Sequence, residues 1–180
     1  MIFVIINKNN CFLELVYFKY LLIISYILIT GVLVNDIVGK EILLVEDNPA
    51  EARLIVEVFD GFKEKNNITI VTDGAQAMGY LNKKGEYTDR KCPSLIILDL
   101  NLPKKDGREV LKEIKQDDDL KIIPVIVLTN SSDEEDVKIA YSNYASAFLT
   151  KPDELHELVE LVKLFEGFWF QWATLPTCNG

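Results

Sequence analysis

Short apolar runs alternate with longer amphipathic segments from about residue 40 to the end of the chain. We predict that the runs are β-strands, at residues 41–46, 68–72, 94–99, 122–129 and 146–150. The segments between and after them have apolar residues at helical spacing and are predicted helices, at residues 49–62, 74–85, 107–116, 132–143 and 152–175. Strict alternation predicts βα units. Because the strands are apolar throughout, helices should cover both faces of a parallel sheet.

Capping residues mark the starts of two predicted helices. Asn48 should cap the first helix, with Pro49 in its first turn and Glu51 at the position of a capping box. The fourth helix should start at Ser132, since Glu135 follows three residues later.

The first 34 residues differ from the rest because no charge interrupts the stretch between Lys19 and Asp36. The apolar run 20–34 is shorter than the roughly 20 residues that span a bilayer, and no small-residue cleavage site follows it. Three interpretations stay open. We favour a misassigned start, with translation beginning at Val34. The others are a membrane anchor and a partner-binding segment.

Composition fits one globular domain with an appendage, since 49% of the 180 residues are hydrophobic and 26% are charged. The net charge of −9 disfavours binding to nucleic acids or anionic lipids. Three widely spaced cysteines indicate neither a metal site nor a disulfide framework and are typical of a reducing cytosol. A single histidine excludes a histidine-based zinc site.

Charged and hydroxyl side chains lie where the predicted strands end. Glu46 and Asp47 end the first strand, Asp99 the third and Thr129 the fourth, and Lys151 follows the fifth. In open α/β sheets, ligands bind beyond the carboxyl ends of the strands. Right-handed crossovers place the first, third and fourth strands side by side. We therefore expect these five side chains to converge.

Their chemistry suits phosphoryl transfer. Clustered carboxylates repel one another unless a cation joins them, and their hard oxygen ligands suit Mg²⁺. Lys151 and Thr129, across from the metal, leave a pocket for a dianion. Asp99 is the central carboxylate and the candidate nucleophile, and carboxylates are known covalent acceptors of phosphoryl groups. Positioning and electrostatics would then carry the reaction.

Four motifs, in this order, resemble the receiver domain of two-component response regulators: LLVEDNP, LDLNLPKKDG, VLTNSS and FLTKP. The resemblance covers about residues 40–161. It implies an α/β, flavodoxin-like (βα)5 fold, with a doubly wound five-stranded parallel sheet of strand order 2-1-3-4-5. It also implies a signalling domain that accepts a phosphoryl group from a histidine kinase and is not an enzyme, beyond catalysing its own phosphorylation and dephosphorylation.

The resemblance assigns the metal ligands. Asp99 would be the phosphorylation site, and Asp47 would bind Mg²⁺ directly. Glu46 would bind through water, and the backbone carbonyl of Asn101 would complete the protein ligands. Glu46 stands where the family more often has aspartate, which bears on how the water shell is ordered.

The resemblance also assigns the phosphoryl contacts and the switch. Thr129 and Lys151 would hold phosphoryl oxygens, and the Lys151–Pro152 bond would be cis. Thr129 and Phe148 would be the switch residues. Because Phe148 replaces the family's tyrosine, its signal would be steric, without a hydroxyl hydrogen bond.

Several segments are similar to stand-alone regulators that partner phytochrome-type histidine kinases: NPAEARLI, LPKKDGREVLKEIK and the aromatic tail. Few residues follow the last helix, so we expect the output to be contact with a downstream protein. We divide the chain into the hydrophobic segment 1–34, a receiver domain at 40–165 and an aromatic tail at 166–180. A cytoplasmic location is expected, or membrane anchoring if the first segment is translated.

The last predicted helix is apolar on more than one face, which indicates that something else covers it. Its apolar side chains are Leu158, Leu161, Val162, Leu164, Phe165, Phe168, Trp169, Phe170 and Trp172. We predict a homodimer through the last two helices and the aromatic tail. The alternative is that the tail packs back on its own chain.

Two other functions fit the sequence less well. An aspartyl-nucleophile phosphohydrolase usually carries its nucleophile after the first strand, with a second acid two residues later, but residues 46–48 here read Glu-Asp-Asn. A phosphorylation-independent scaffold would not need the combination of acids, hydroxyl and lysine.

Overall fold

The computed structural model describes residues 39–60 and 66–176. In this part of the chain, five parallel strands form one sheet in the order β2-β1-β3-β4-β5. The strands are β1 (Glu41–Val45), β2 (Asn67–Val71), β3 (Leu95–Leu98), β4 (Val125–Thr129) and β5 (Ala147–Thr150). The fold class and the strand order predicted from the sequence are confirmed.

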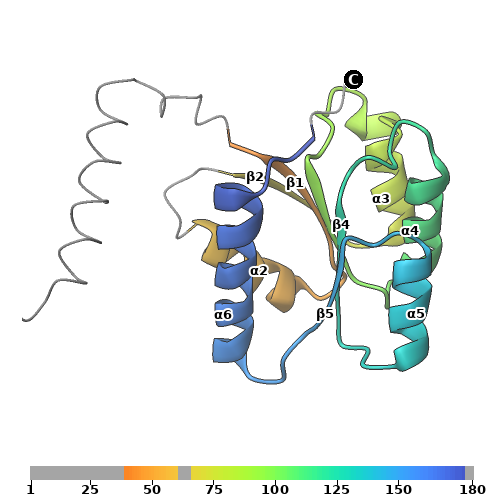
Figure 1. The fold of residues 1–180 in the computed structure, drawn as a ribbon. Coiled ribbons are helices and arrows are strands. Elements are labelled where there is room, and N and C mark those ends of the chain that lie inside the picture. The colour runs from red at the N-terminus through yellow and green to blue at the C-terminus, as the bar shows by residue number, and fades with distance from the viewer. Residues whose placement is uncertain (1–38, 61–65, 177–180) are drawn as a thin grey trace, which may run out of the picture. The chain divides into compact units, whose positions relative to one another are not determined.

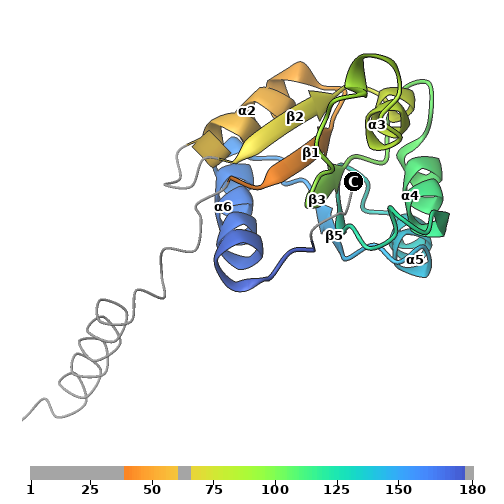
Figure 2. The same ribbon diagram turned by 90° about the horizontal axis from the view of Figure 1, so that it is seen from above.

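Helices cover both faces of the sheet. They are α2 (Pro49–Asp60), α3 (Gly74–Leu81), α4 (Gly107–Gln116), α5 (Glu134–Ser142) and α6 (Leu155–Glu166). A 3-10 turn, η1 (Gly85–Tyr87), follows α3, and a π-helix, η2 (Gly167–Trp172), continues α6. Helices α2 and α6 lie on one face, and α3, α4 and α5 lie on the other (Figure 1 and Figure 2).

Each face of the sheet has its own apolar core. Along β1, Leu43 faces the core under α3, α4 and α5, whereas Ile42 and Leu44 face the core under α2 and α6. Both sets of side chains are buried. This two-sided burial explains why the strand sequences are continuously apolar.

Strand β4 starts later than predicted, at Val125 rather than at Ile122. Ile122 is 51% exposed, and Pro124 has no N–H to donate to a neighbouring strand. The apolar sequence therefore extends three residues beyond the sheet, where periodicity alone cannot separate strand from loop.

Two helix starts also differ from the prediction. Asp133 caps α5, because its carboxylate accepts the N–H of Glu135 at 2.9 Å, so Ser132 is not the cap. The last helix starts at Leu155 rather than at residue 152, and it changes to a π-helix at Gly167. The Asn48 cap predicted for α2 is present, since its side chain accepts the N–H of Ala50 at 3.0 Å. The capping box is not formed, because the backbone N–H of Asn48 donates to Glu46, and Glu51 accepts from the side-chain amide of Asn48 instead.

Cys92 is disulfide-bonded, which corrects the expectation that the cysteines form no disulfide. Wide spacing along the chain says little about distance in the fold, so the spacing could not exclude such a bond. The other two cysteines lie outside the described residues.

Within residues 39–60 and 66–176, no helix is long and apolar enough to cross a membrane. The apolar segment 20–34 lies outside the described residues, so the interpretations offered for it stay predictions.

Candidate functional site

The carboxyl ends of β1 and β3 lie level with each other. Val45 pairs with Leu98 across the two strands, and the N–H of Asp99 donates to the carbonyl of Val45 at 3.0 Å. Glu46 and Asp99, which follow these paired residues, therefore leave the sheet side by side. Both are buried, with 2% of Glu46 and 5% of Asp99 exposed.

Asp47 adds a third carboxylate beside this pair. One carboxylate oxygen from each of Glu46, Asp47 and Asp99 lies within 4.8 Å of the other two, and Asp47 is exposed. A single ion could contact all three oxygens, and the exposed side would leave part of its shell to water. Such a set of hard oxygen donors fits Mg²⁺ or a similar divalent ion.

The backbone after β3 also reaches the buried carboxylate. The N–H of Asn101 donates to Oδ1 of Asp99 at 3.0 Å. This bond folds the loop after β3 back over Asp99, so the backbone of Asn101 lies against the acidic cluster. The side chain of Asn101 is exposed.

Lys151 reaches the same acids from the loop after β5. Its ammonium lies 2.6 Å from Oε2 of Glu46 and 2.7 Å from Oδ2 of Asp99, and both contacts are hydrogen bonds. The backbone N–H of Lys151 donates to the carbonyl of Thr129 at 2.8 Å, which fixes the loop to the end of β4. The ammonium is therefore held between the two buried carboxylates.

Burial and charge pull the pKa values in opposite directions here. Burial raises the pKa of Glu46 above its ordinary value, although the contact with Lys151 opposes the shift. Burial alone would lower the pKa of Lys151, but its hydrogen bonds to Asp99 and Glu46 outweigh burial and raise it. One ammonium thus remains charged among acids that it does not fully neutralise, which is a good environment for an added cation.

Thr129 ends β4 at the same edge of the sheet. In the register of β3 and β4, Leu98 pairs with Val127, so Thr129 lies one position farther along its strand than Asp99. Thr129 is fully buried, and its hydroxyl oxygen accepts a long hydrogen bond of 3.4 Å from the N–H of Ser131. The hydroxyl therefore lies where the loop after β4 leaves the sheet.

Phe148 lies in β5, opposite Val127 of β4. It is half-buried and packs against the core under α3, α4 and α5. This position is two residues before the edge that carries the charged groups, so Phe148 adjoins the site through β4 without belonging to the charged cluster.

Of the residues predicted from the sequence, the structure brings Glu46, Asp47 and Asp99 together as an acidic cluster. Lys151 contacts Glu46 and Asp99 of this cluster. Asn101, Thr129 and Phe148 lie around them as described above. One expectation is wrong: the described residues contain no cis peptide bond, so the Lys151–Pro152 bond is trans. Trans is the intrinsically preferred isomer even before proline.

Glu51 also belongs to the site, and the sequence indicated only a capping role for it. Its Oε2 lies 2.7 Å from the ammonium of Lys151. A hollow of about 300 Å³ opens beside them, between α2 and the loop after β5, and Leu54, Asn130 and Pro152 are among its walls. The capping-box spacing could have drawn attention to Glu51, but not to a lysine 100 residues later.

A second polar network was also missed. Arg108, in the first turn of α4, donates two hydrogen bonds to the carboxylate of Asp136 in α5, at 2.6 and 2.5 Å. Asp136 also accepts the hydroxyl of Ser131 at 2.5 Å. Because the N–H of Ser131 donates to Thr129, the network connects α4 and α5 to the loop that carries the buried hydroxyl.

Comparisons with known proteins agree with this geometry. The family model described as response regulator receiver domain matches residues 42–163. Response regulator Rcp1 of Synechocystis sp. is 50% identical over 137 residues, which cover 76% of this chain and 93% of that protein. The probable methanogenesis regulatory protein FilR2 of Methanothrix harundinacea is 41% identical over 135 residues, covering 75% of this chain and 86% of that protein.

Two solved structures are similar over nearly their whole length. The phosphorylated cyanobacterial phytochrome response regulator RcpA has a TM-score of 0.76 and 48% identity, and the match covers 77% of this chain and 99% of that one. The Mn²⁺-bound form of Rcp1 has a TM-score of 0.75 and 49% identity, with 77% and 100% covered. The chain belongs to the response regulator receiver family.

Proposed function

We propose that the chain is a stand-alone receiver that accepts a phosphoryl group on Asp99 from the phosphohistidine of a sensor histidine kinase. The observation that carries this proposal is the contact of 2.7 Å between the Lys151 ammonium and the Asp99 carboxylate, beside a cluster of three carboxylates. A nucleophilic acid, a metal-binding set and a fixed cation are thus within reach of one dianion.

The transfer exchanges one bond to phosphorus for another. A carboxylate oxygen of Asp99 attacks the phosphorus, the P–N bond to the kinase histidine breaks, and the imidazole leaves with the electron pair and takes up a proton. The product is an acyl phosphate on Asp99. Lys151 holds one equatorial oxygen and the Thr129 hydroxyl another, so charge on these oxygens is met by donors already in place.

Glu46, Asp47, Asp99 and the backbone carbonyl of Asn101 would hold Mg²⁺, with Glu46 acting through a water molecule. The bound ion supplies charge stabilisation at the transferring phosphoryl group. The existence of a Mn²⁺-bound form of the relative Rcp1 supports binding of a divalent ion. The short range among the three carboxylate oxygens supports it in this chain.

We infer that Thr129 and Phe148 carry the signal away from Asp99. A new phosphoryl group draws the Thr129 hydroxyl inwards, and Phe148, on the neighbouring strand, fills the space by a steric shift. The change biases the surface of α5 and α6 between two states and alters its affinity for a downstream protein. The similarity to the cyanobacterial phytochrome response regulator RcpA supports a phytochrome-like kinase as the phosphoryl donor.

We propose further that two copies pair through α5, α6 and the aromatic tail. Part of the tail packs back on its own chain, since Phe170 is buried and its ring lies 5.9 Å from that of Phe59. Leu164, Phe168 and Trp172 remain exposed at spacings of four residues. A second copy is the occupant that would cover them.

The proposed division of the chain keeps the receiver at residues 40–165 and the aromatic tail at 166–180. The match of the family model to residues 42–163 supports the two boundaries of the receiver. The hydrophobic segment 1–34 is the remaining part of this division, and its three interpretations stay open as stated above. The receiver's only catalysis would be its own phosphorylation and dephosphorylation.

Incubation with acetyl phosphate and Mg²⁺, followed by intact-mass measurement, tests the proposal. A receiver gains one phosphoryl mass, and Asp99→Asn gains none. Repeated turnover of acetyl phosphate without a stable adduct would instead indicate the phosphohydrolase. The absence of both an adduct and turnover would indicate the scaffold.

A further inference from the structure

Helix α2 brings an additional carboxylate to the lysine of the site. Glu51, in the first turn of α2, has one oxygen 2.7 Å from the side-chain amide of Asn48, which donates to it. Its other oxygen, Oε2, lies 2.7 Å from the Lys151 ammonium. The first contact holds Glu51 at the N-terminus of the helix, and the second points it at the phosphoryl pocket.

The contact between Glu51 and Lys151 is an ion pair without a directed hydrogen bond. Oε2 of Glu51 is shielded from solvent and accepts no hydrogen bond within the described residues, although the ammonium is adjacent. The ammonium instead donates to Glu46 and Asp99. Three acceptors therefore compete for one cation, and Glu51 is the one left with the poorest geometry.

The negative charges around Lys151 disfavour the approach of a phosphoryl dianion. Three carboxylates, those of Glu46, Glu51 and Asp99, contact the one ammonium. Asp47 adds a fourth carboxylate beside Glu46 and Asp99. A phosphoryl donor brings further negative charge to the same cation. Glu51 is not among the residues that would hold the metal, so its charge opposes the incoming dianion without a compensating role at the ion.

We propose that Glu51 is a positioning residue that competes with the phosphoryl group for the Lys151 ammonium and so restrains phosphorylation of Asp99. This inference rests on the proposed function. While the site is unphosphorylated, Glu51 anchors the loop after β5 to α2 through Lys151. When a phosphoryl oxygen takes the ammonium, that anchor weakens, and the loop is free to follow the phosphoryl group.

Glu51→Gln tests the charge while keeping the shape. Glutamine has the same length and keeps one side-chain oxygen as an acceptor, but it carries no charge and so does not attract the ammonium as an ion. We expect the second-order rate constant for phosphorylation by acetyl phosphate, with Mg²⁺ present, to rise about fivefold, the size typical of one partly exposed ion pair. The affinity for BeF₃⁻, which mimics a bound phosphoryl group without transferring it, should rise by a similar factor.

Two controls separate this role from helix capping. Glu57→Gln removes the same charge from the exposed side of α2, where Glu57 pairs with Arg53 at 3.1 Å, and it should change neither quantity. In a Lys151→Met background, Glu51→Gln should no longer raise BeF₃⁻ affinity, because the contested cation is gone. A capping role would be insensitive to Lys151.

The outcomes distinguish the inference from the function beneath it. If the unaltered chain gains no phosphoryl mass, the proposed function itself fails. If the chain is phosphorylated but Glu51→Gln matches Glu57→Gln or reacts more slowly, the competition at Lys151 is refuted. An equal gain with and without Lys151 would also refute it, since it would reflect only the net charge of the pocket.

Discussion

Asp99 lies in a pocket where acids outnumber the single base that touches them. Glu46 and Asp99 are both buried against Lys151, and Asp47 lies at the open side. Groups that repel one another in this way cost stability, and a fold retains them where the chemistry needs them. Burial is the main cause of the raised pKa of Glu46, and the charge of Asp99 raises it further, whereas Lys151 opposes the shift.

Mg²⁺ should therefore stabilise the folded chain by itself, before any phosphoryl donor is present. An ion that binds only the folded state at ten times its dissociation constant adds about 1.4 kcal/mol to the free energy of unfolding. Urea titrations with and without Mg²⁺ measure this gain. Asp47→Asn should largely abolish it.

The matched control is Asp119→Asn, which removes one exposed acid from the loop after α4, outside the site. It should leave the gain from Mg²⁺ unchanged. An equal gain in wild type and Asp47→Asn would contradict the assignment of Asp47 as a direct ligand.

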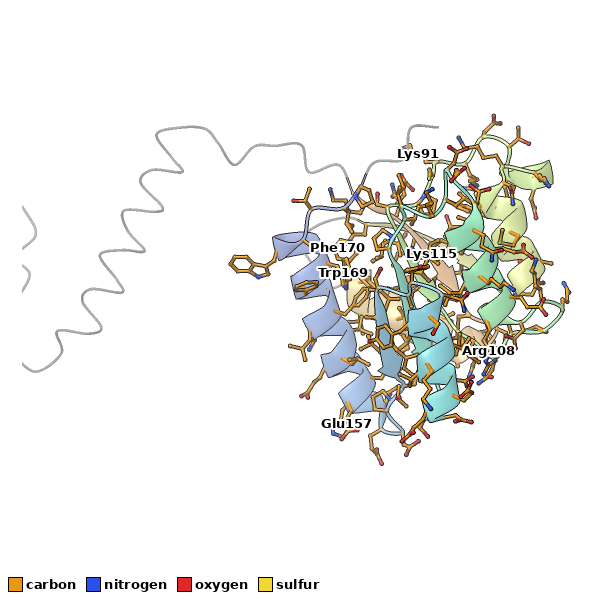
Figure 3. The ribbon with its side chains drawn as sticks, turned by 45° about the vertical axis from the view of Figure 1, so that its right-hand side comes forward. Lys91, Arg108, Lys115, Glu157, Trp169 and Phe170 are labelled. Atoms are coloured by element: carbon orange, nitrogen blue, oxygen red, sulfur yellow. The ribbon has the colours of Figure 1, made fainter. Side chains whose placement is uncertain are left out.

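The elements around the pocket are joined by polar contacts as well as by apolar packing. Arg108 lies at the start of α4, near the start of α5, as Figure 3 shows. Its two hydrogen bonds to Asp136 and the bond from Ser131 tie both helices to the loop after β4. A movement of Thr129 would thus be transmitted to helix starts and not only to a loop.

Asp136→Asn should lower the free energy of unfolding at pH 7 by about 2 kcal/mol, because it weakens charge-assisted hydrogen bonds in a buried position. The hydrogen bonds from Arg108 hold the pKa of Asp136 below its ordinary value of 3.8. A lowered carboxyl pKa stabilises the fold above the unfolded value and loses that effect as the pH falls through the folded value. The difference between wild type and variant should therefore shrink below about pH 4.

Glu134→Gln serves as the control for this prediction, since it removes one acid from the same helix turn at an exposed side chain. Urea unfolding at several pH values measures the free energy of unfolding of wild type, Asp136→Asn and Glu134→Gln. A deficit for Asp136→Asn that stays constant down to pH 3 would show that the carboxylate charge is not its source.

The turn into α4 depends on a glycine. A Cβ on Gly107 would lie 2.1 Å from the carbonyl oxygen of Asp99 and 2.6 Å from Cα of Leu100. Both atoms are backbone and cannot move aside cheaply. Gly107→Ala should therefore destabilise the fold by about 3 kcal/mol, at the upper end of the range for overpacking.

Gly167→Ala is the opposite case. Among the described residues, nothing beyond its own stretch of helix backbone lies within 4 Å of the place that a Cβ would occupy, and the backbone of Gly167 is helical. It should stabilise by about 0.5–1 kcal/mol. Thermal unfolding of the two variants measures both effects, and an equal loss in both would show that the loss is a general cost of adding a methyl group.

Elements and strand ends were predictable because their signals are local. The apolar runs locate the strands, and the crossover rule then brings the acids of residues 46, 47 and 99 together. The partnerships of Glu51 with Lys151 and of Arg108 with Asp136 were not predictable in this way, because each joins residues far apart in sequence through side-chain geometry. The predicted start of β4 was wrong for a different reason: Ile122 is apolar but exposed, and the proline that follows it delays the strand.

On the scale of the molecule, the charged site and the aromatic tail lie at opposite ends of α6. Glu157 lies near the start of the helix, whereas Trp169 and Phe170 lie just beyond its end (Figure 3). Phe165 and Phe170 pack on Phe59 of α2, so one side of the tail is already covered. The uncovered side runs along Leu164, Phe168 and Trp172.

If this uncovered side is a dimer interface, Phe168→Glu should convert the chain to a monomer at micromolar concentration, because it places a charge in a surface that must become dry. Light scattering measures the mass. Gln116→Glu adds the same charge at the exposed end of α4 and should leave a dimer intact. A wild-type chain that is monomeric, or a dimer unaffected by Phe168→Glu, would contradict the proposed pairing.

The most direct measurement on the whole chain identifies the residue that carries the phosphoryl group. Borohydride reduces an acyl phosphate of aspartate to homoserine, so the chain is incubated with acetyl phosphate and Mg²⁺, reduced, digested and sequenced by mass spectrometry. The account predicts homoserine at position 99 alone, and none when Mg²⁺ is left out. Homoserine at position 47, a reduced Glu46, or no reduced residue at all would contradict it.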